Sequence, residues 1–144
     1  MKFVSLEEIN NYSTNIITMN YSIESKDLYH QITVSDDYLT TVEAQELVNV
    51  VEQHVKKSPV HNFIIDFSSV SDMEPEISPI LLGLHNDIYD QEASIVFACV
   101  QEVMLHKFKQ EQLHLTLNVT PTVIEAIDII SMEMLERDLL QEEE

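Results

Sequence analysis

Two short and almost continuously apolar runs constrain the fold of this chain more than any other feature. They are NFIIDF (62–67) and SIVFACV (94–100), and both have the length of a strand rather than of a helix. A strand with apolar side chains on both sides is covered on both faces, as in a parallel sheet between helices. The segments around these runs carry apolar residues at helical spacing. The alternation predicts an α/β fold with a mixed, mostly parallel sheet.

The best-marked helix precedes the first of these strands. Thr40-x-x-Glu43 forms a capping box, which signals a helix start. Lys56 and Lys57 suit the carboxyl end of the helix dipole, and Pro59 prevents continuation. The apolar residues between these signals recur at i, i+3, i+4 and i+7: Ala44, Leu47, Val48, Val51 and Val55.

Two further helices are predicted from a hydroxyl residue followed by proline. Ser78 is placed as the N-cap of one helix, with Pro79 at its first position. Thr120-Pro121 repeats this signal and opens the last helix. The residues expected to face inward are Leu81, Leu84 and Ile88 in the first helix, and Val123, Ile124, Ile127, Ile130 and Met134 in the second.

The remaining elements complete a single domain over residues 1–144. Alternation in 14–23 and 28–34 predicts an opening hairpin, with His30 on the apolar face of its second strand. Val103, Met104 and Phe108 indicate a short helix, and LHLTL (113–117) a last strand. The predicted order is β-β-α-β-α-β-α-β-α, a sheet of about five strands with four helices.

Charge narrows the classes of partner. The chain has 26 acidic and 7 basic residues, a formal net charge of −19. The electrostatic field of so negative a protein repels the phosphate backbone of nucleic acids and anionic lipid. We therefore expect neither a nucleic acid nor a membrane surface as a partner. The N-terminal residues lack the apolar core of a signal peptide, and no run has the length of a membrane span. We therefore expect a cytoplasmic protein.

Metal, cofactor and catalytic motifs are not recognisable. Cys99 is the only cysteine, and the single glycine, Gly83, leaves no phosphate-binding loop. The densest set of oxygen and nitrogen donors is His85, Asn86 and Asp87 with Asp90 and Glu92, which lacks the spacing of a calcium loop and suits a solvated helix end. No G-x-S-x-G elbow is present. We expect no cofactor, no metal and no enzymatic activity.

The turn after the first apolar strand reads DFSSVSDMEPEISPILLGL (66–84). Together with the order of elements, NFIIDFSSVSDM…ILLGL resembles the STAS domain, the fold shared by bacterial anti-sigma-factor antagonists and the cytoplasmic tails of sulfate transporters. NFIID, ending in Asp66, is similar to the family's central strand, FSSVSDM to its turn and PILLGL to its next helix. SIVFACVQEVMLHKFKQEQL and VTPTVIEAIDII resemble later elements. The resemblance spans about residues 28–135.

One departure from the family pattern bears on function. The family carries an Asp, a phosphorylatable Ser or Thr and one or two glycines where this chain reads Glu74-Pro75-Glu76-Ile77. A direct alignment places Pro75, which has no hydroxyl, at the phosphorylated position. The resemblance implies a bacterial regulatory partner, such as an anti-sigma factor or a switch kinase, but not the usual phospho-switch.

The acidic residues of the turn offer an explanation for that departure. Asp72, Glu74 and Glu76 precede a predicted helix N-terminus, where negative charge is favoured by ~0.3–1 kcal/mol per group. We hypothesise that they hold the site in a state resembling the phosphorylated one. The alternative is that they only suit a helix start. A displaced phosphosite at Ser71 or Ser78 is a further alternative, with Ser68 and Ser69 as weaker candidates.

The sequence thus predicts a non-enzymatic module that binds a regulatory protein. Its binding surface would be the turn Ser68–Ser78 and the exposed side of the following helix, including Asn86 and Asp87. A small hydrophobic ligand in the Met- and Ile-rich core is an alternative. A hydrolytic or metal enzyme dependent on His85 is a second alternative, and a homodimer through the hairpin stays open.

Overall fold

A computed structural model describes residues 19–142, and its centre is one five-stranded sheet. The sheet order is β1-β2-β4-β6-β7; β1 runs antiparallel to β2, and every other neighbouring pair is parallel. The predicted α/β class with a mixed, mostly parallel sheet is confirmed. The strands are β1 (Tyr21–Ser25), β2 (His30–Val34), β4 (Phe63–Asp66), β6 (Ile95–Ala98) and β7 (Val119–Thr120).

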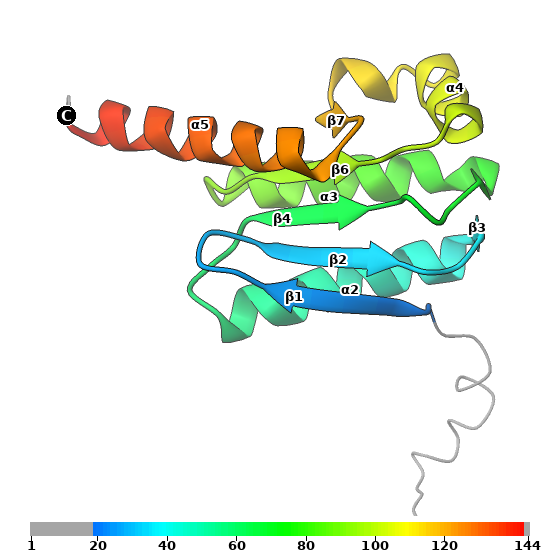
Figure 1. The fold of residues 1–144 in the computed structure, drawn as a ribbon, viewed down its shortest axis with the longest axis horizontal. Helices are drawn as coiled ribbons and strands as arrows, with labels where there is room; N and C mark the ends of the chain where they lie inside the picture. The colour runs from blue at the N-terminus through cyan, green and yellow to red at the C-terminus, as the bar shows by residue number, and fades with distance from the viewer. Residues whose placement is uncertain (1–18, 143–144) are drawn as a thin grey trace, which may run out of the picture.

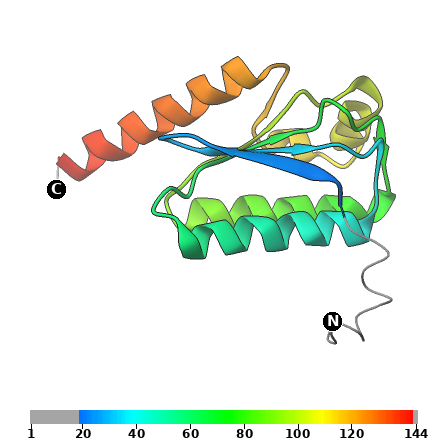
Figure 2. The same ribbon diagram turned by 60° about the horizontal axis from the view of Figure 1, so that its bottom comes forward.

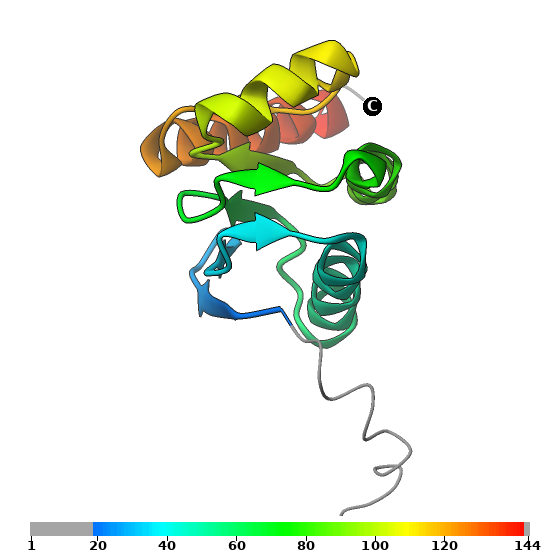
Figure 3. The same cartoon turned by 90° about the vertical axis from the view of Figure 1, so that its right-hand side faces the viewer.

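Helices cover both faces of this sheet. Two of them, α2 (Thr41–Lys57) and α3 (Ser78–Asp90), run side by side on one face (Figures 2 and 3). The long α5 (Val123–Glu142) lies on the opposite face (Figure 2). The short α4 (Glu102–Gln110) lies at the end of the sheet where β2 and β4 terminate (Figure 1). The helix predicted from the capping box is confirmed, since Thr40 and Glu43 make both of its hydrogen bonds.

The central position of β4 and β6 in the sheet explains why their sequences are almost entirely apolar. Phe63 and Ile65 of β4 pack into the larger core cluster, which fills the space between the sheet and α2 and α3. Ile64 points the other way, into a smaller cluster with Ala126 and Ile130 of α5. Because successive strand residues face opposite sides, a sheet covered on both faces needs apolar residues throughout β6 and at every position of β4 before its terminal Asp66.

A second, two-stranded sheet was not predicted from the sequence. It pairs β3 (Tyr38–Leu39) in parallel with β5 (Asp72–Met73), at the same end of the domain as α4 (Figure 1). Strands of two residues are too short to show the alternation of apolar and polar residues from which a strand is predicted. The small sheet fixes the middle of the 66–78 turn against the segment that leads into α2.

The strand predicted over 113–117 is wrong. Residues Leu113–Leu115 form a 3-10 helix, η3, and the last strand begins later, at Val119. The backbone N–H groups of Thr116 and Leu117 both donate to the Leu113 carbonyl, which closes a helical turn. Leu113 and Leu117 are buried while Leu115 is 72% exposed, so the apolar spacing that matters is four residues, not two.

Neither predicted N-cap residue has that role in the structure: the N-cap of α3 is Ile77, one residue before Ser78, and that of α5 lies two residues after Thr120. Ser78 is the first residue of α3 rather than its N-cap, because the chain enters α3 through a 3-10 turn, η2 (Pro75–Ile77). Thr120 ends β7, and Thr122 caps α5 by accepting a hydrogen bond from the Glu125 N–H at 3.2 Å. Ile124, predicted to face inward, is 72% exposed.

The opening hairpin is confirmed as β1 and β2, with a different first strand. Residues 14–18 of the predicted strand lie outside the described part of the chain, and β1 continues to Ser25, two residues beyond the predicted end at residue 23. His30 is a hydrogen-bonded core histidine, as predicted: its Nδ1 lies 2.8 Å from Ser25 Oγ and its Nε2 3.0 Å from the Val60 carbonyl.

Candidate partner-binding surface

The 66–78 turn lies where the parallel strands end, the usual place for ligand sites in α/β folds. Asp66 closes its first part by accepting a hydrogen bond from the Ser68 N–H at 2.9 Å. Phe67 and Val70 are fully buried and anchor the turn in the core, whereas Ser68 and Ser69 between them are exposed. The two buried side chains therefore fix the position of the exposed serines on the surface.

Ser71 uses its hydroxyl within this turn. The Oγ donates to the Asp37 carboxylate at 2.8 Å and approaches the Asp37 carbonyl at 3.1 Å, and the Ser71 N–H donates to the same carbonyl at 2.7 Å. A phosphate on Ser71 would face the Asp37 carboxylate and would break these bonds by like-charge repulsion.

Asp72 is committed to an ion pair. Its Oδ1 lies 2.5 Å from the Nζ of Lys107 on α4, and the same ammonium donates to the Met73 carbonyl at 3.1 Å. The hydrogen bond from Lys107 lowers the pKa of Asp72, and the Met73 N–H contributes in the same direction. The Asp72 carboxylate thus ties the turn to α4 with its charge largely compensated.

Glu74 caps a helix other than the one the sequence indicated. Its Oε1 accepts a hydrogen bond from the N–H of Thr41, the first residue of α2, at 2.5 Å. This N–H is one of the donors that a helix start leaves unpaired, and it lies beside the capping box of Thr40 and Glu43. The carboxylate therefore stabilises α2 from across the chain.

The exposed polar residues of the predicted set are Glu76, Asn86 and Asp87. Glu76 projects from η2, and within the described residues its carboxylate has no hydrogen-bond or ion-pair partner. Asn86 and Asp87 lie on the outer face of α3, between the buried His85 and Ile88. The structure thus separates the predicted acids into two that hold the turn and two that face solvent.

Ser78, predicted as an N-cap and as a candidate phosphosite, is buried. Its side chain is 5% exposed, and within the described residues its Oγ has no hydrogen-bond partner. A position in the first turn of α3, directly after the buried Ile77, turns this side chain inward. A kinase could reach this oxygen only after local opening of the helix start.

The donor set around His85 is divided between the core and the solvent. The His85 ring is 9% exposed and lies against Tyr89, with ring centroids 4.5 Å apart, and burial lowers the pKa of His85. Asn86 and Asp87 point away from it. Across residues 19–142, no group of three or more His, Cys, Asp or Glu side chains is arranged to hold a metal ion.

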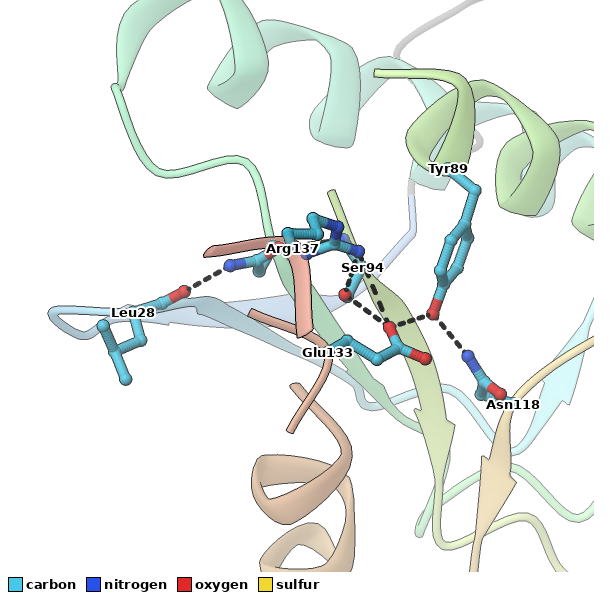
Figure 4. Close-up of polar contacts among 7 residues, drawn as sticks. Leu28, Tyr89, Ser94, Asn118, Glu133 and Arg137 are labelled. Carbon is cyan, nitrogen blue, oxygen red and sulfur yellow. Dashed lines mark hydrogen bonds and ion pairs between the residues drawn. The ribbon is translucent and has the colours of Figure 1, made fainter. Parts of the chain in front are cut away.

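Sequence reasoning missed a polar cluster that joins α5 to the rest of the domain (Figure 4). The Glu133 Oε1 accepts hydrogen bonds from Ser94 Oγ at 2.6 Å and from Tyr89 OH at 2.7 Å. Arg137 donates to Ser94 Oγ at 2.7 Å, and Asn118 donates to the Tyr89 hydroxyl. Burial and the Glu133 carboxylate raise the pKa of Tyr89. The five residues come from four segments, so no local pattern could reveal them.

An open groove of about 420 Å³ runs between α2 and α3, beside Asp87. Its floor is apolar, with Val51 and Val55 from α2 facing Leu84 and Ile88 from α3. A groove of this size lies within the range of small-molecule sites.

Comparison with known proteins identifies the fold. The family model of the STAS domain matches residues 30–126. A candidate anti-sigma factor antagonist from Thermotoga maritima is similar at a TM-score of 0.66, with 12% identity over 77% of this chain and 94% of its own. The antagonist SpoIIAA in its unphosphorylated form gives 0.64, with 15% identity over 78% of this chain and 96% of its own.

A structure of the Bacillus cell fate determinant SpoIIAA in its phosphorylated form is also similar. Its TM-score is 0.58, with 16% identity over 77% of this chain and 99% of its own. No curated protein matches the sequence significantly. Within residues 19–142, none of the helices combines the length and the apolar character needed to span a bilayer.

Proposed function

The chain belongs to the STAS domain family, and from this premise we propose that it is a non-enzymatic regulatory module that binds another protein. The proposed surface is the turn Ser68–Ser78 together with the outer face of α3. The partner class is that of anti-sigma factors or switch kinases, the partners implied by the antagonist-like fold. The partner recognises permanently charged carboxylates, so binding does not depend on reversible phosphorylation.

The observation that carries this proposal is the state of the hydroxyls and carboxylates in the turn. Pro75 has no hydroxyl, the Ser78 Oγ is buried, and the Ser71 Oγ is bonded to Asp37. Glu76 in η2 and Asp87 on α3 are both exposed. Asp72 and Glu74 contribute by holding the turn in shape.

The test is a pull-down from lysate of the native host at low and high salt. The wild type is compared with a Glu76→Lys/Asp87→Lys variant and with a matched charge control, Glu24→Lys/Asp27→Lys, in the distant hairpin. We expect a protein retained by wild type and by the control, lost by the first variant and weakened by salt. Equal retention by all three would move the interface elsewhere.

A phospho-regulated antagonist is the second candidate, favoured by the partial exposure of Ser71. It predicts a mass increase of ~80 Da, one phosphate, on protein purified from the native host. Unmodified protein under all growth conditions would exclude it. Loss of the Ser71–Asp37 bond in the modified form would open the small sheet of β3 and β5.

A small hydrophobic ligand is the third candidate, and the groove between α2 and α3 is the specific observation behind it. Native mass spectrometry of protein from the host would reveal a bound molecule, and Leu84→Gln, on the floor of the groove, would release it. Protein of the apo mass throughout would argue against this function.

A further inference from the structure

Helix α5 is apolar on two opposite sides. Ala126 and Ile130 are buried against the sheet, as expected of a surface helix. On the side facing solvent lie Ile124, Met132, Leu135 and Leu139, which are between 51% and 72% exposed. We call these four residues the α5 stripe. A helix that is apolar on both sides is normally covered on both.

The stripe lies along one side of the helix, with Asp128 between Ile124 and the other three members. Its members stand at i, i+8, i+11 and i+15, so at 100° per residue they fall within one sector about 80° wide, and they extend over about 22 Å of helix. Scattered exposed apolar residues need no explanation, but an aligned row of this length marks an interaction site. All of its members except Ile124 lie beyond residue 126, where the family match ends, and the last turns of α5 project past the sheet (Figures 1 and 2).

The charges beside the stripe define the chemistry of what covers it. Glu125 and Glu136 flank the stripe on one side, Asp138 on the other, and Asp128 lies within it. Residues 123–142 hold six acids and one base, Arg137, which is 3.7 Å from Glu133. A second copy of this helix would bring two acidic rims together, and anionic lipid would be repelled in the same way.

We propose that the α5 stripe binds a basic amphipathic helix of a partner protein. Apolar side chains of that helix would cover Leu135 and Leu139, and its lysines or arginines would meet the acidic rim. The stripe lies on the opposite face of the sheet from α3, so this site is distinct from the surface around Glu76 and Asp87 (Figure 2). The domain can then hold two proteins at once.

The test uses the full chain and a synthetic probe. The probe is a fluorescein-labelled peptide with leucine at i, i+3, i+4 and i+7 and lysine elsewhere; a scrambled peptide of the same composition is its control. Binding is measured by fluorescence anisotropy. The protein variant is Leu135→Gln/Leu139→Gln, which keeps good helix formers in α5. The matched variant is Val103→Gln/Leu115→Gln, which changes two apolar residues outside α5 that are at least as exposed as Leu139.

We expect the stripe variant to weaken binding of the amphipathic peptide by about tenfold or more, and the matched variant to change it by less than about twofold. The scrambled peptide should bind the wild-type protein as weakly as the amphipathic peptide binds the stripe variant. Equal affinity of both peptides, or of both variants, would show attraction by net charge alone and would overturn the proposal. So would a dimer in sedimentation velocity that the stripe variant abolishes, because the second copy would then be the occupant.

Discussion

The two roles assigned to the acids of the turn make a sharp prediction for Glu74. Its carboxylate accepts the Thr41 N–H, a donor at the start of α2, from a position 33 residues away. A hydrogen bond to a charged group contributes about 1.5–3 kcal/mol, and loss of a helix cap costs about 0.5–2 kcal/mol. Glu74 is only half-buried, and Thr40 still caps the helix, so we take the lower part of these ranges.

We therefore expect Glu74→Ala to lower the free energy of unfolding by about 1–2 kcal/mol. The matched variant is Glu76→Ala, which removes the same charge two residues away from an exposed carboxylate, and its effect should stay within about 0.5 kcal/mol. Urea unfolding followed by circular dichroism measures both. Equal destabilisation by the two variants, or none by either, would refute the separation of roles.

Three further predictions concern stability. Burial lowers the pKa of His30 below its unfolded value, so the unfolded chain binds more protons, and stability falls as the pH drops below about 6.5. Urea unfolding midpoints should therefore decrease with falling pH, and His30→Asn should reduce this dependence on pH. Glu133→Ala leaves the hydroxyls of Tyr89 and Ser94 without their acceptor, and it should lower the free energy of unfolding, measured by thermal unfolding, by about 2–3 kcal/mol. The control variant Glu136→Ala should lower it by less than about 0.5 kcal/mol. Lys107→Ala breaks a partly exposed ion pair, so we expect only a small loss of stability, and this loss should shrink in high salt.

The sequence predicted the elements whose signals are local. The capping box of Thr40 and Glu43, the doubly apolar strands and the buried His30 all appear in the structure as predicted. In each case the residues that carry the pattern also make the contact. The sheet order follows from right-handed parallel crossovers, which leave few alternatives for such a chain.

The errors arose where distant contacts decide the local structure. LHLTL alternates like a strand, but Leu113 and Leu117 both reach the core from one helical turn. Glu74 precedes α3 in the sequence, yet its partner is in α2, because the pairing of β3 with β5 brings that segment to the turn. Lys107, which neutralises Asp72, is 35 residues away.

The exposed residues of the candidate surface were better predicted than the anchored ones. Asn86 and Asp87 were placed on the outer side of their helix from helical periodicity alone, and they lie there. Ser78 was not, because the 3-10 turn before α3 shifts the start of the helix and rotates that side chain inward. Pro75 showed that the turn lacks a hydroxyl at that position, but it did not predict the 3-10 turn of the backbone.

Hydrogen–deuterium exchange of the protein with its captured partner shows directly whether the turn and α3 form the binding surface. We expect slowed exchange, on partner binding, in the turn Ser68–Ser78 and along α3, and unchanged exchange in the β1–β2 hairpin. The same pattern should occur with protein that carries no phosphate. Protection confined to the hairpin or to α5 would contradict binding at the turn and α3. Binding that requires a phosphorylated serine would contradict recognition through carboxylates.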